Sequence, residues 1–303
     1  MTKNGKTISL VLGSGGARGM AHIGVIRELE AAGFTVVSIA GCSAGALVGG
    51  VYAAGKLDEF ENWVCAIDNV GLVKLLDIAW ERHGLVKGDR VIETLVDLVG
   101  DVRIEDLDIP FTAVATDIRR QKEVWLNSGP LFFAIRASGS LPFFLTPVEY
   151  RDSFLIDGGV LNPVPIAPTF NDDCDFILAV NLSGPPVEDP AALLGMPEEE
   201  EEPPDSSGLR RKVDEFIDDL QESFNSSDRN LGMYDVGSQA FDAMQGAIAR
   251  HKLAVYPPDH TIEIPRNVCG TLDFDMSEAL IRLGRERTRE WLDSLPVAVK
   301  ASG

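Results

Sequence analysis

Cysteine and histidine are both scarce in this sequence. The 303 residues include only four of each, and the cysteines show neither C-x-x-C spacing nor a Cys/His pattern typical of a metal site. The sequence therefore predicts no disulfide framework and no metal, and it favours reduced thiols in a cytoplasmic protein. The four cysteines are Cys42, Cys65, Cys174 and Cys269.

Positive charge is also in short supply. Lys and Arg together number 27 against 47 Asp and Glu, which gives a formal net charge of -20. Such a charge repels the phosphates of nucleic acids and anionic lipid headgroups over a Debye length, so we predict no nucleic-acid partner. The hydrophobic content of 45% is ordinary for a globular protein with a full core, and we expect one domain over residues 1–303.

Long apolar runs are few. The N-terminal residues 1–6 are polar and precede only a short apolar run before Gly13, so no signal peptide is predicted. One stretch, residues 34–55, carries no charge and has glycines at G-x-x-x-G spacing, which leaves a membrane span as an alternative. Its first part is β-branched and its second part rich in Ala and Gly, so a buried strand followed by a buried helix is the better prediction. At most we expect peripheral contact with the inner face of a membrane.

Apolar strand-like runs alternate with helix-like segments along most of the chain. This alternation predicts an α/β fold with a mostly parallel central sheet covered on both faces, a three-layer sandwich with its core in about residues 7–182. Strands are expected at residues 7–12, 36–40, 111–116, 123–126, 154–156, 176–181 and 261–264. Helices are expected up to about residues 32 and 54, at 89–99, 131–137, 228–251 and 276–295, with helical or irregular cover at 58–76.

The pattern changes after residue 184. Residues 185–207 hold an unbroken acidic run between prolines, which predicts a mobile loop. Residues 208–295 then form a helical C-terminal extension with one strand. Within it, the apolar residues of the segment 209–224 fall on one helical face. That helix is either a lid over a lipid site or an ordinary amphipathic helix packed on the domain or on a second subunit of a homo-oligomer.

The sequence Gly41-Cys42-Ser43-Ala44-Gly45 follows a predicted strand and precedes a predicted helix. A nucleophilic serine needs such a strand, sharp turn and helix, and the flanking glycines suit the tight backbone of the turn. A lone G-x-S-x-G also arises by chance in a chain with 29 glycines. Ser43 is nonetheless our candidate nucleophile, because further candidates for catalytic groups accompany it.

The glycine loop between the first strand and its helix could supply an oxyanion hole. Gly15 and Gly16 offer unhindered backbone N–H groups at a helix N-terminus, and Arg18 adds a cation beside them. Because Gly13 and Gly15 also fit the start of a dinucleotide fingerprint, nucleotide binding is the rival hypothesis. It fails because Arg18 occupies the third glycine position and no acidic residue ends the second strand.

A serine nucleophile also needs a base. Of the four histidines, His22 lies inside a predicted helix, where a packed histidine is the ordinary explanation, and the other three have no motif around them. Asp157 instead ends a predicted strand and precedes Gly158 and Gly159. A hairpin turn is the plain alternative for this Asp-Gly pair. As a base, Asp157 would need burial to raise its proton affinity.

Three blocks, Gly13 to Gly19, Gly41 to Gly45 and Asp157 to Gly159, resemble in order and spacing the signature blocks of the patatin-like phospholipases. Residues 111–117, 135–142 and 162–165 are also similar to that family, and the layout to about residue 295 resembles its bacterial branch related to neuropathy target esterase. The segment 185–250 carries no motif of the family, and Gly13-Ser14 differs from the acidic, glycine-rich start of plant patatins.

The resemblance implies a patatin-like hydrolase fold and a Ser-Asp dyad without histidine. Ser43 would be the nucleophile, Asp157 the base, and Gly15, Gly16 and Arg18 the oxyanion hole, without calcium or another cofactor. We therefore expect a serine acyl hydrolase that cleaves lipid acyl esters, with lysophospholipids or simple carboxylic esters as substrates. The alternative is a regulatory or scaffolding protein that keeps the fold but turns over little substrate.

Overall fold

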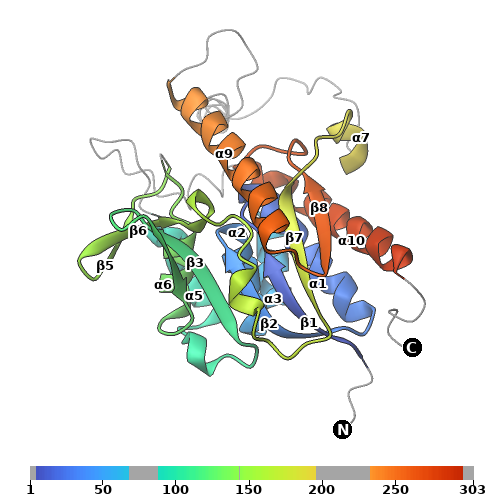
Figure 1. Cartoon of the computed structure of the whole chain (residues 1–303), viewed down its shortest axis with the longest axis horizontal. Helices are drawn as coiled ribbons and strands as arrows, with labels where there is room; N and C mark the ends of the chain where they lie inside the picture. Colours follow the sequence, from blue (N-terminus) through green and yellow to red (C-terminus); the bar gives the residue numbers. More distant parts are fainter. Residues whose placement is uncertain (1–4, 68–87, 143, 196–232, 296–303) are drawn as a thin grey trace.

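A mixed sheet of eight strands runs through the centre of the molecule (Figure 1). The computed structural model describes residues 5–67, 88–142, 144–195 and 233–295. The strand order is β5-β6-β3-β2-β1-β7-β8, and β4 also pairs with β3. The strands are β1 (Thr7–Leu12), β2 (Thr35–Cys42), β3 (Phe111–Asp117), β4 (Lys122–Leu126), β5 (Val148–Tyr150), β6 (Ser153–Asp157), β7 (Phe176–Gly184) and β8 (His260–Pro265).

The central part of this sheet is parallel. Strands β3, β2, β1, β7 and β8 pair in parallel, whereas β4 and β6 run antiparallel to β3 and β5 runs antiparallel to β6. Five of the six residues of β1 are buried, so this strand is apolar on both faces. Burial on both faces is what a parallel strand covered by helices requires.

Helices cover both faces of the sheet and make three layers (Figure 1). On one face, the alternate β1 side chains Ile8, Leu10 and Leu12 join the main core with the helices packed there. On the other, Val11 packs in a small cluster with Ala249 of α9. The helices are α1 (Ala21–Ala31), α2 (Ala44–Ala53), α3 (Leu57–Cys65), α5 (Asp89–Val99), α6 (Leu131–Ser138), α7 (Pro190–Leu194), α9 (Met233–Val255) and α10 (Ser277–Ser294), with short 3-10 turns η1 (Gly16–Met20), η2 (Ile104–Asp106), η3 (Gly158–Val160), η4 (Ala167–Thr169) and η5 (Phe274–Met276).

Helices α1 and α10 touch through glycine. A Cβ on Gly284 would lie 2.0 Å from the carbonyl oxygen of Ala21, and one on Gly24 would lie 1.9 Å from that of Ile281. The same pair of helices shares an ion pair, in which Arg289 donates to both carboxylate oxygens of Glu28 at 2.6 and 3.0 Å. Arg285 of α10 also pairs with Glu28, at 3.4 Å, so two glycines and two salt bridges bring α10 against α1.

The predicted α/β three-layer fold is confirmed, and so are the strand and helix expected in residues 34–55, which form β2 and α2. No helix among the described residues is long and apolar enough to cross a bilayer. The sequence did not predict β5, which has only three residues, nor α7, which lies inside the stretch 185–207 expected to be a loop. The acidic run, the amphipathic segment 209–224 and His83 lie outside the described residues. Of the cover expected at 58–76, the first part is helical in α3, and residues 68–76 lie outside the described residues.

Candidate active site

Strands β2 and β6 pair with the same edge of β3, β2 along its first residues and β6 along its last. Cys42 at the end of β2 pairs with Val114 of β3, and Asp157 at the end of β6 pairs with the next residue, Ala115. The opposite edge of β3 is occupied by β4 along this whole stretch. Ser43, which directly follows Cys42, therefore emerges beside Asp157.

Ser43 sits at a strained turn between β2 and α2. Its φ of 54° and ψ of -120° lie outside the regions that residues with a Cβ favour. The Ser43 N–H donates to the Ser138 hydroxyl at 2.9 Å, and that hydroxyl donates to the Val114 carbonyl at 2.6 Å. These bonds anchor the turn to β3 through α6, and they leave the Ser43 hydroxyl outside the helix that follows.

The glycines predicted to support this turn do so by close approach. A Cβ on Gly45 would lie 2.1 Å from the carbonyl oxygen of Leu12, which is far too close. A Cβ on Gly41 would lie 2.5 Å from the carbonyl oxygen of Gly45, and one on Gly13 would lie 2.7 Å from that of Val180. The start of α2 can therefore lie against the end of β1 only because these positions carry no side chain.

Asp157 is fully buried. Burial raises the pKa of its carboxyl to about 6, although the Ser43 hydroxyl and the Gly159 N–H both favour the charged form. The Gly159 N–H donates to Oδ1 at 2.7 Å. Oδ2 has no hydrogen-bond partner among the described residues. One oxygen of this carboxylate is thus held in place, while the other can accept a proton from a group that approaches it.

Gly158 and Gly159 let the Asp157 turn pack closely on its surroundings. A Cβ on Gly158 would lie 2.0 Å from the Val114 carbonyl oxygen, and one on Gly159 would lie 2.1 Å from Nε2 of Gln245 in α9. The plain hairpin alternative for Asp-Gly is wrong, because Asp157 leads into η3 rather than into an antiparallel partner strand.

The glycine loop after β1 is pinned on both sides of its two predicted donors. The N–H groups of Gly13 and Ser14 donate to the carbonyls of Val180 and Pro163 at 3.0 and 2.8 Å, and the Ala17 N–H donates to the Thr271 carbonyl at 2.9 Å. Within the described part of the chain, the N–H groups of Gly15 and Gly16 donate to no protein acceptor. Both residues line a cleft together with Ser43.

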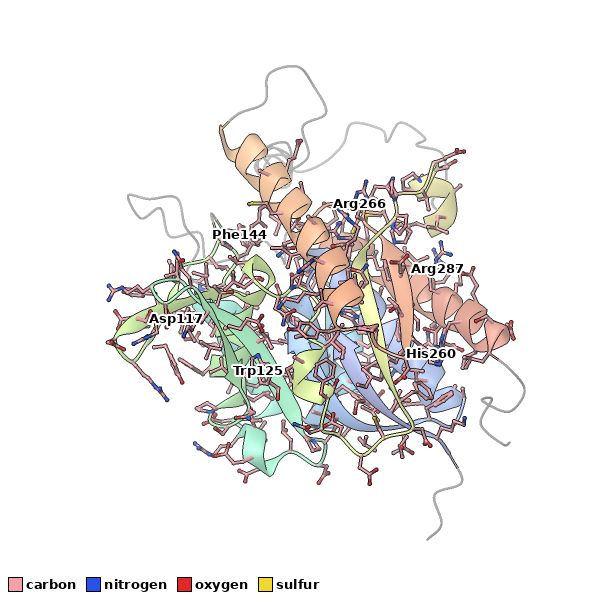
Figure 2. All side chains as sticks on the ribbon, viewed as in Figure 1. Asp117, Trp125, Phe144, His260, Arg266 and Arg287 are labelled. Carbon is pink, nitrogen blue, oxygen red and sulfur yellow. The ribbon has the colours of Figure 1, made fainter. Side chains whose placement is uncertain are left out.

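Arg18 is buried and hydrogen-bonds to the backbone of the glycine loop. Its Nε donates to the carbonyl of Gly15 at 3.2 Å, and its Nη1 donates to the carbonyl of Arg266. Figure 2 shows Arg266 and Phe144 on the side of the molecule where the parallel strands end. The cation that the sequence predicted beside the oxyanion therefore lines the cleft and also fixes the backbone of the donor loop.

His22 lies close to this loop but not as a base. It is fully buried, its Nε2 is 2.9 Å from the Gly13 carbonyl oxygen, and Nδ1 has no partner among the described residues. Burial lowers its pKa to about 4, so the ring is neutral near pH 7 and Nε2 donates. Neither ring nitrogen has a hydrogen bond to Ser43.

Two hollows that differ in the residues lining them meet at Ser43. The larger, about 1120 Å³ with its open mouth included, is lined mainly by apolar side chains of α3, α5, α6 and the loop after α6. The smaller lies between the glycine loop and α9, and its lining includes apolar Leu141, Pro142 and Phe241. We name it the polar cleft after the side chains of Ser14, Arg18, Asp242 and Gln245, which also line it. Both hollows are lined by Gly16, Ser43, Leu141 and Thr271. The apolar residues of the larger hollow include Phe60, Trp63, Leu95, Ile135 and Phe144.

Sequence reasoning missed the contribution of α9 to the cleft. Phe241, Asp242 and Gln245 all line it, and Gln245 is buried with its Nε2 3.4 Å from the Ser14 hydroxyl. The spacing of Gln245 and the buried Ala249, four residues apart, places both on one face of the predicted helix and could have indicated that Gln245 faces the domain. No motif marked that face as part of a site.

Comparison with known proteins agrees with this geometry. A family model described as patatin-like phospholipase matches residues 10–170. An uncharacterised NTE family protein of Mycobacterium bovis is 36% identical over 96% of this chain and 92% of its own length. The chain belongs to the patatin-like phospholipase family.

More distant members of the patatin-like phospholipase family match a smaller share of the chain. The lysophospholipase NTE1 of Saccharomyces cerevisiae is 34% identical over 59% of this chain and 11% of that protein. The neuropathy target esterase sws of Drosophila melanogaster is 32% identical over 59% of this chain and 13% of that protein. The expected patatin-like fold and the expected class of enzyme, a lipid ester hydrolase, are confirmed.

Proposed function

We propose that this patatin-like protein hydrolyses fatty-acyl esters of the lysophospholipid or simple carboxylic ester type through a Ser43-Asp157 dyad. The observation that carries the proposal is that Cys42, which directly precedes Ser43, and Asp157 pair with consecutive residues of β3. The names of the yeast and fly relatives, a lysophospholipase and an esterase, support the class of substrate.

The reaction begins when the Ser43 hydroxyl attacks the ester carbonyl and its proton moves to Oδ2 of Asp157. The carbonyl oxygen becomes an oxyanion, which the N–H groups of Gly15 and Gly16 stabilise while Arg18 holds their loop. The ester C–O bond then breaks, and the alcohol leaves with the proton held by Asp157. Ser43 is now acylated.

Water completes the cycle by the same route. It attacks the acyl-enzyme and gives a proton to Asp157, the oxyanion forms again in the same place, and the fatty acid leaves as Ser43 regains its proton. The raised pKa of Asp157 supports this role, because a carboxylate with a pKa of about 6 holds a proton better than an exposed aspartate. His22 is not needed in this cycle, because Asp157 takes and returns the proton and burial lowers the pKa of His22 to about 4.

A fluorophosphonate probe, which labels activated serines, tests the proposal. We expect rapid labelling of the wild-type protein, none of Ser43→Ala, and a loss on the order of 100-fold or more in Asp157→Asn. Asp173→Asn is the matched control, because Asp173 is exposed and precedes the amino-terminal end of β7, whereas Ser43 follows the carboxyl end of the parallel strand β2. His22→Gln keeps a donor for Gly13 and should still be labelled.

Three results would count against this mechanism. Labelling that survives Asp157→Asn would remove Asp157 as the base, and labelling lost in folded His22→Gln would restore a histidine. An unreactive Ser43 in a folded protein would favour the regulatory or scaffolding alternative. The cytoplasmic location, the peripheral membrane contact and the homo-oligomer remain predictions.

A further inference from the structure

The two hollows at Ser43 divide an ester substrate into its two parts. This step rests on the proposed function. If Ser43 attacks the carbonyl, the acyl chain and the alcohol must leave the reacting carbon in different directions. The larger hollow is walled by side chains such as Phe60, Trp63 and Leu95, which suits a hydrocarbon chain. The alcohol is then left with the polar cleft.

Helix α9 forms the outer wall of that cleft. Gln245 fixes the helix there, because it is buried, reaches the Ser14 hydroxyl and fills the space that a side chain on Gly159 would need. Asp242 lies three residues earlier on α9 and also lines the cleft. A buried anchor thus places a carboxylate opposite the catalytic serine.

The Asp242 carboxylate shares the cleft with one positive charge, that of Arg18. Neighbouring protein atoms raise its pKa, although its side chain is open to the cleft, and the charge of Arg18 lowers it. Arg18 donates through Nε and Nη1 to backbone carbonyls, so its guanidinium is fixed in place. It is the only cationic side chain among the described residues that line this cleft.

We propose that the polar cleft is a leaving-group subsite in which Asp242 selects alcohols that carry hydrogen-bond donors and no net negative charge. A glyceryl group fits this description, because its hydroxyls can donate to the carboxylate of Asp242. A phosphate monoester does not fit, because its charge would be repelled by that carboxylate.

Two substrates with one acyl chain test the subsite. We choose 1-octanoylglycerol and 1-octanoyl lysophosphatidate, both kept below their micelle concentrations so that interfacial effects are absent. We expect wild-type kcat/KM to favour the glycerol ester by about tenfold or more. Asp242→Asn should reduce this preference to about threefold or less, mainly because the anionic ester is hydrolysed faster.

Matched variants separate the local charge from the charge of the whole chain. Asp242→Glu keeps the carboxylate and should keep the preference for the glycerol ester. Asp173→Asn removes one charge near the amino-terminal end of β7 and should leave that preference unchanged. Circular dichroism and the thermal midpoint establish that each variant is folded. If Asp242→Asn does not fold, a preference kept in Asp242→Glu and shifted in Asp242→Ser tests the same point.

The outcomes distinguish this proposal from the proposed function. An equal preference in wild type and Asp242→Asn, or a wild-type preference for the anionic ester, would overturn the subsite while Ser43-dependent hydrolysis of p-nitrophenyl octanoate still stood. If wild-type protein does not hydrolyse p-nitrophenyl octanoate in a Ser43-dependent way, the proposed function fails and the subsite fails with it.

Discussion

Ser43 and Asp157, the proposed nucleophile and base, are each held in a locally unfavourable state. Ser43 keeps a positive φ, which costs on the order of 1–3 kcal/mol for a residue with a Cβ. Asp157 is a carboxyl group without solvent contact, with one oxygen unpaired among the described residues. Such conditions raise reactivity at the expense of stability.

Removing the charge of Asp157 should therefore stabilise the fold. The pKa is raised from 3.8 to about 6, so the native protein binds more protons than the unfolded chain between these values. The resulting stability is fully present below pH 3.8 and is lost as pH rises through 6. At pH 8 we expect Asp157→Asn to raise the free energy of unfolding by about 2–3 kcal/mol in urea titrations.

Near pH 4 the same variant should gain little, because the wild-type carboxyl is then mostly protonated. Asp173→Asn, an exposed site, should change neither value by more than about 0.5 kcal/mol. A loss of stability at pH 8 in Asp157→Asn would show that the charged form is favoured by the fold, contrary to the effect of burial.

The activity should rise as Asp157 loses its proton, whereas the stability falls over the same pH range. A base works only when deprotonated, so kcat/KM for a neutral ester should rise between pH 5 and 7 with a midpoint near 6. Assays with p-nitrophenyl octanoate at constant ionic strength measure this. A rate that is flat across this range, or that falls, would exclude Asp157 as the base.

At this scale the sequence was informative wherever a motif marked the residue. Ser43 and Asp157 stand in glycine-flanked blocks, and the structure brings them to one place. Asp242 and Gln245 could not be found in this way, because their position depends on where α9 docks and no local pattern encodes docking. The hydrogen bond between His22 and the Gly13 carbonyl was not predicted either, because no motif marks this contact between α1 and the loop that precedes it.

At the scale of elements, the inner parallel strands β1, β2, β3 and β7 were predictable because each contains a short apolar run that is mostly buried. Strand β5 was not, since its three residues exist only through pairing with β6. Helix α7 was hidden in an acidic, proline-rich stretch, although Asp189 caps it by accepting a hydrogen bond from the Ala192 N–H.

The glycine contact between α1 and α10 gives a test at this scale. A Cβ on Gly284 would overlap the Ala21 carbonyl, so Gly284→Ala must separate the helices. We expect a loss of about 1–3 kcal/mol in the free energy of unfolding, measured in urea.

Gly246 in α9 is the matched control for this substitution. A Cβ there would meet only the guanidinium end of Arg250, at 3.5 Å. Gly246→Ala should therefore stabilise the protein by about 0.5–1 kcal/mol, the helix preference of alanine over glycine. Equal effects of the two substitutions would mean that the contact between α1 and α10 is unimportant.

For the whole molecule, the excess of acidic residues governs which surfaces it approaches. A net charge of -20 should weaken binding to vesicles that contain phosphatidylglycerol relative to pure phosphatidylcholine vesicles. Flotation at about 10 mM salt should show the difference, and at about 150 mM, where the Debye length falls from ~30 to ~8 Å, it should shrink. Tighter binding to phosphatidylglycerol at low salt would instead indicate a local basic surface.

The shared edge of β3 also bears on when the chain becomes reactive. Ser43 follows β2 and Asp157 ends β6, and β3, β4 and β5 lie between them in the chain. If Asp157 is the base proposed above, a nascent chain halted before β6 has the serine without its proton acceptor. On that mechanism, hydrolysis begins only after β6 has paired with β3.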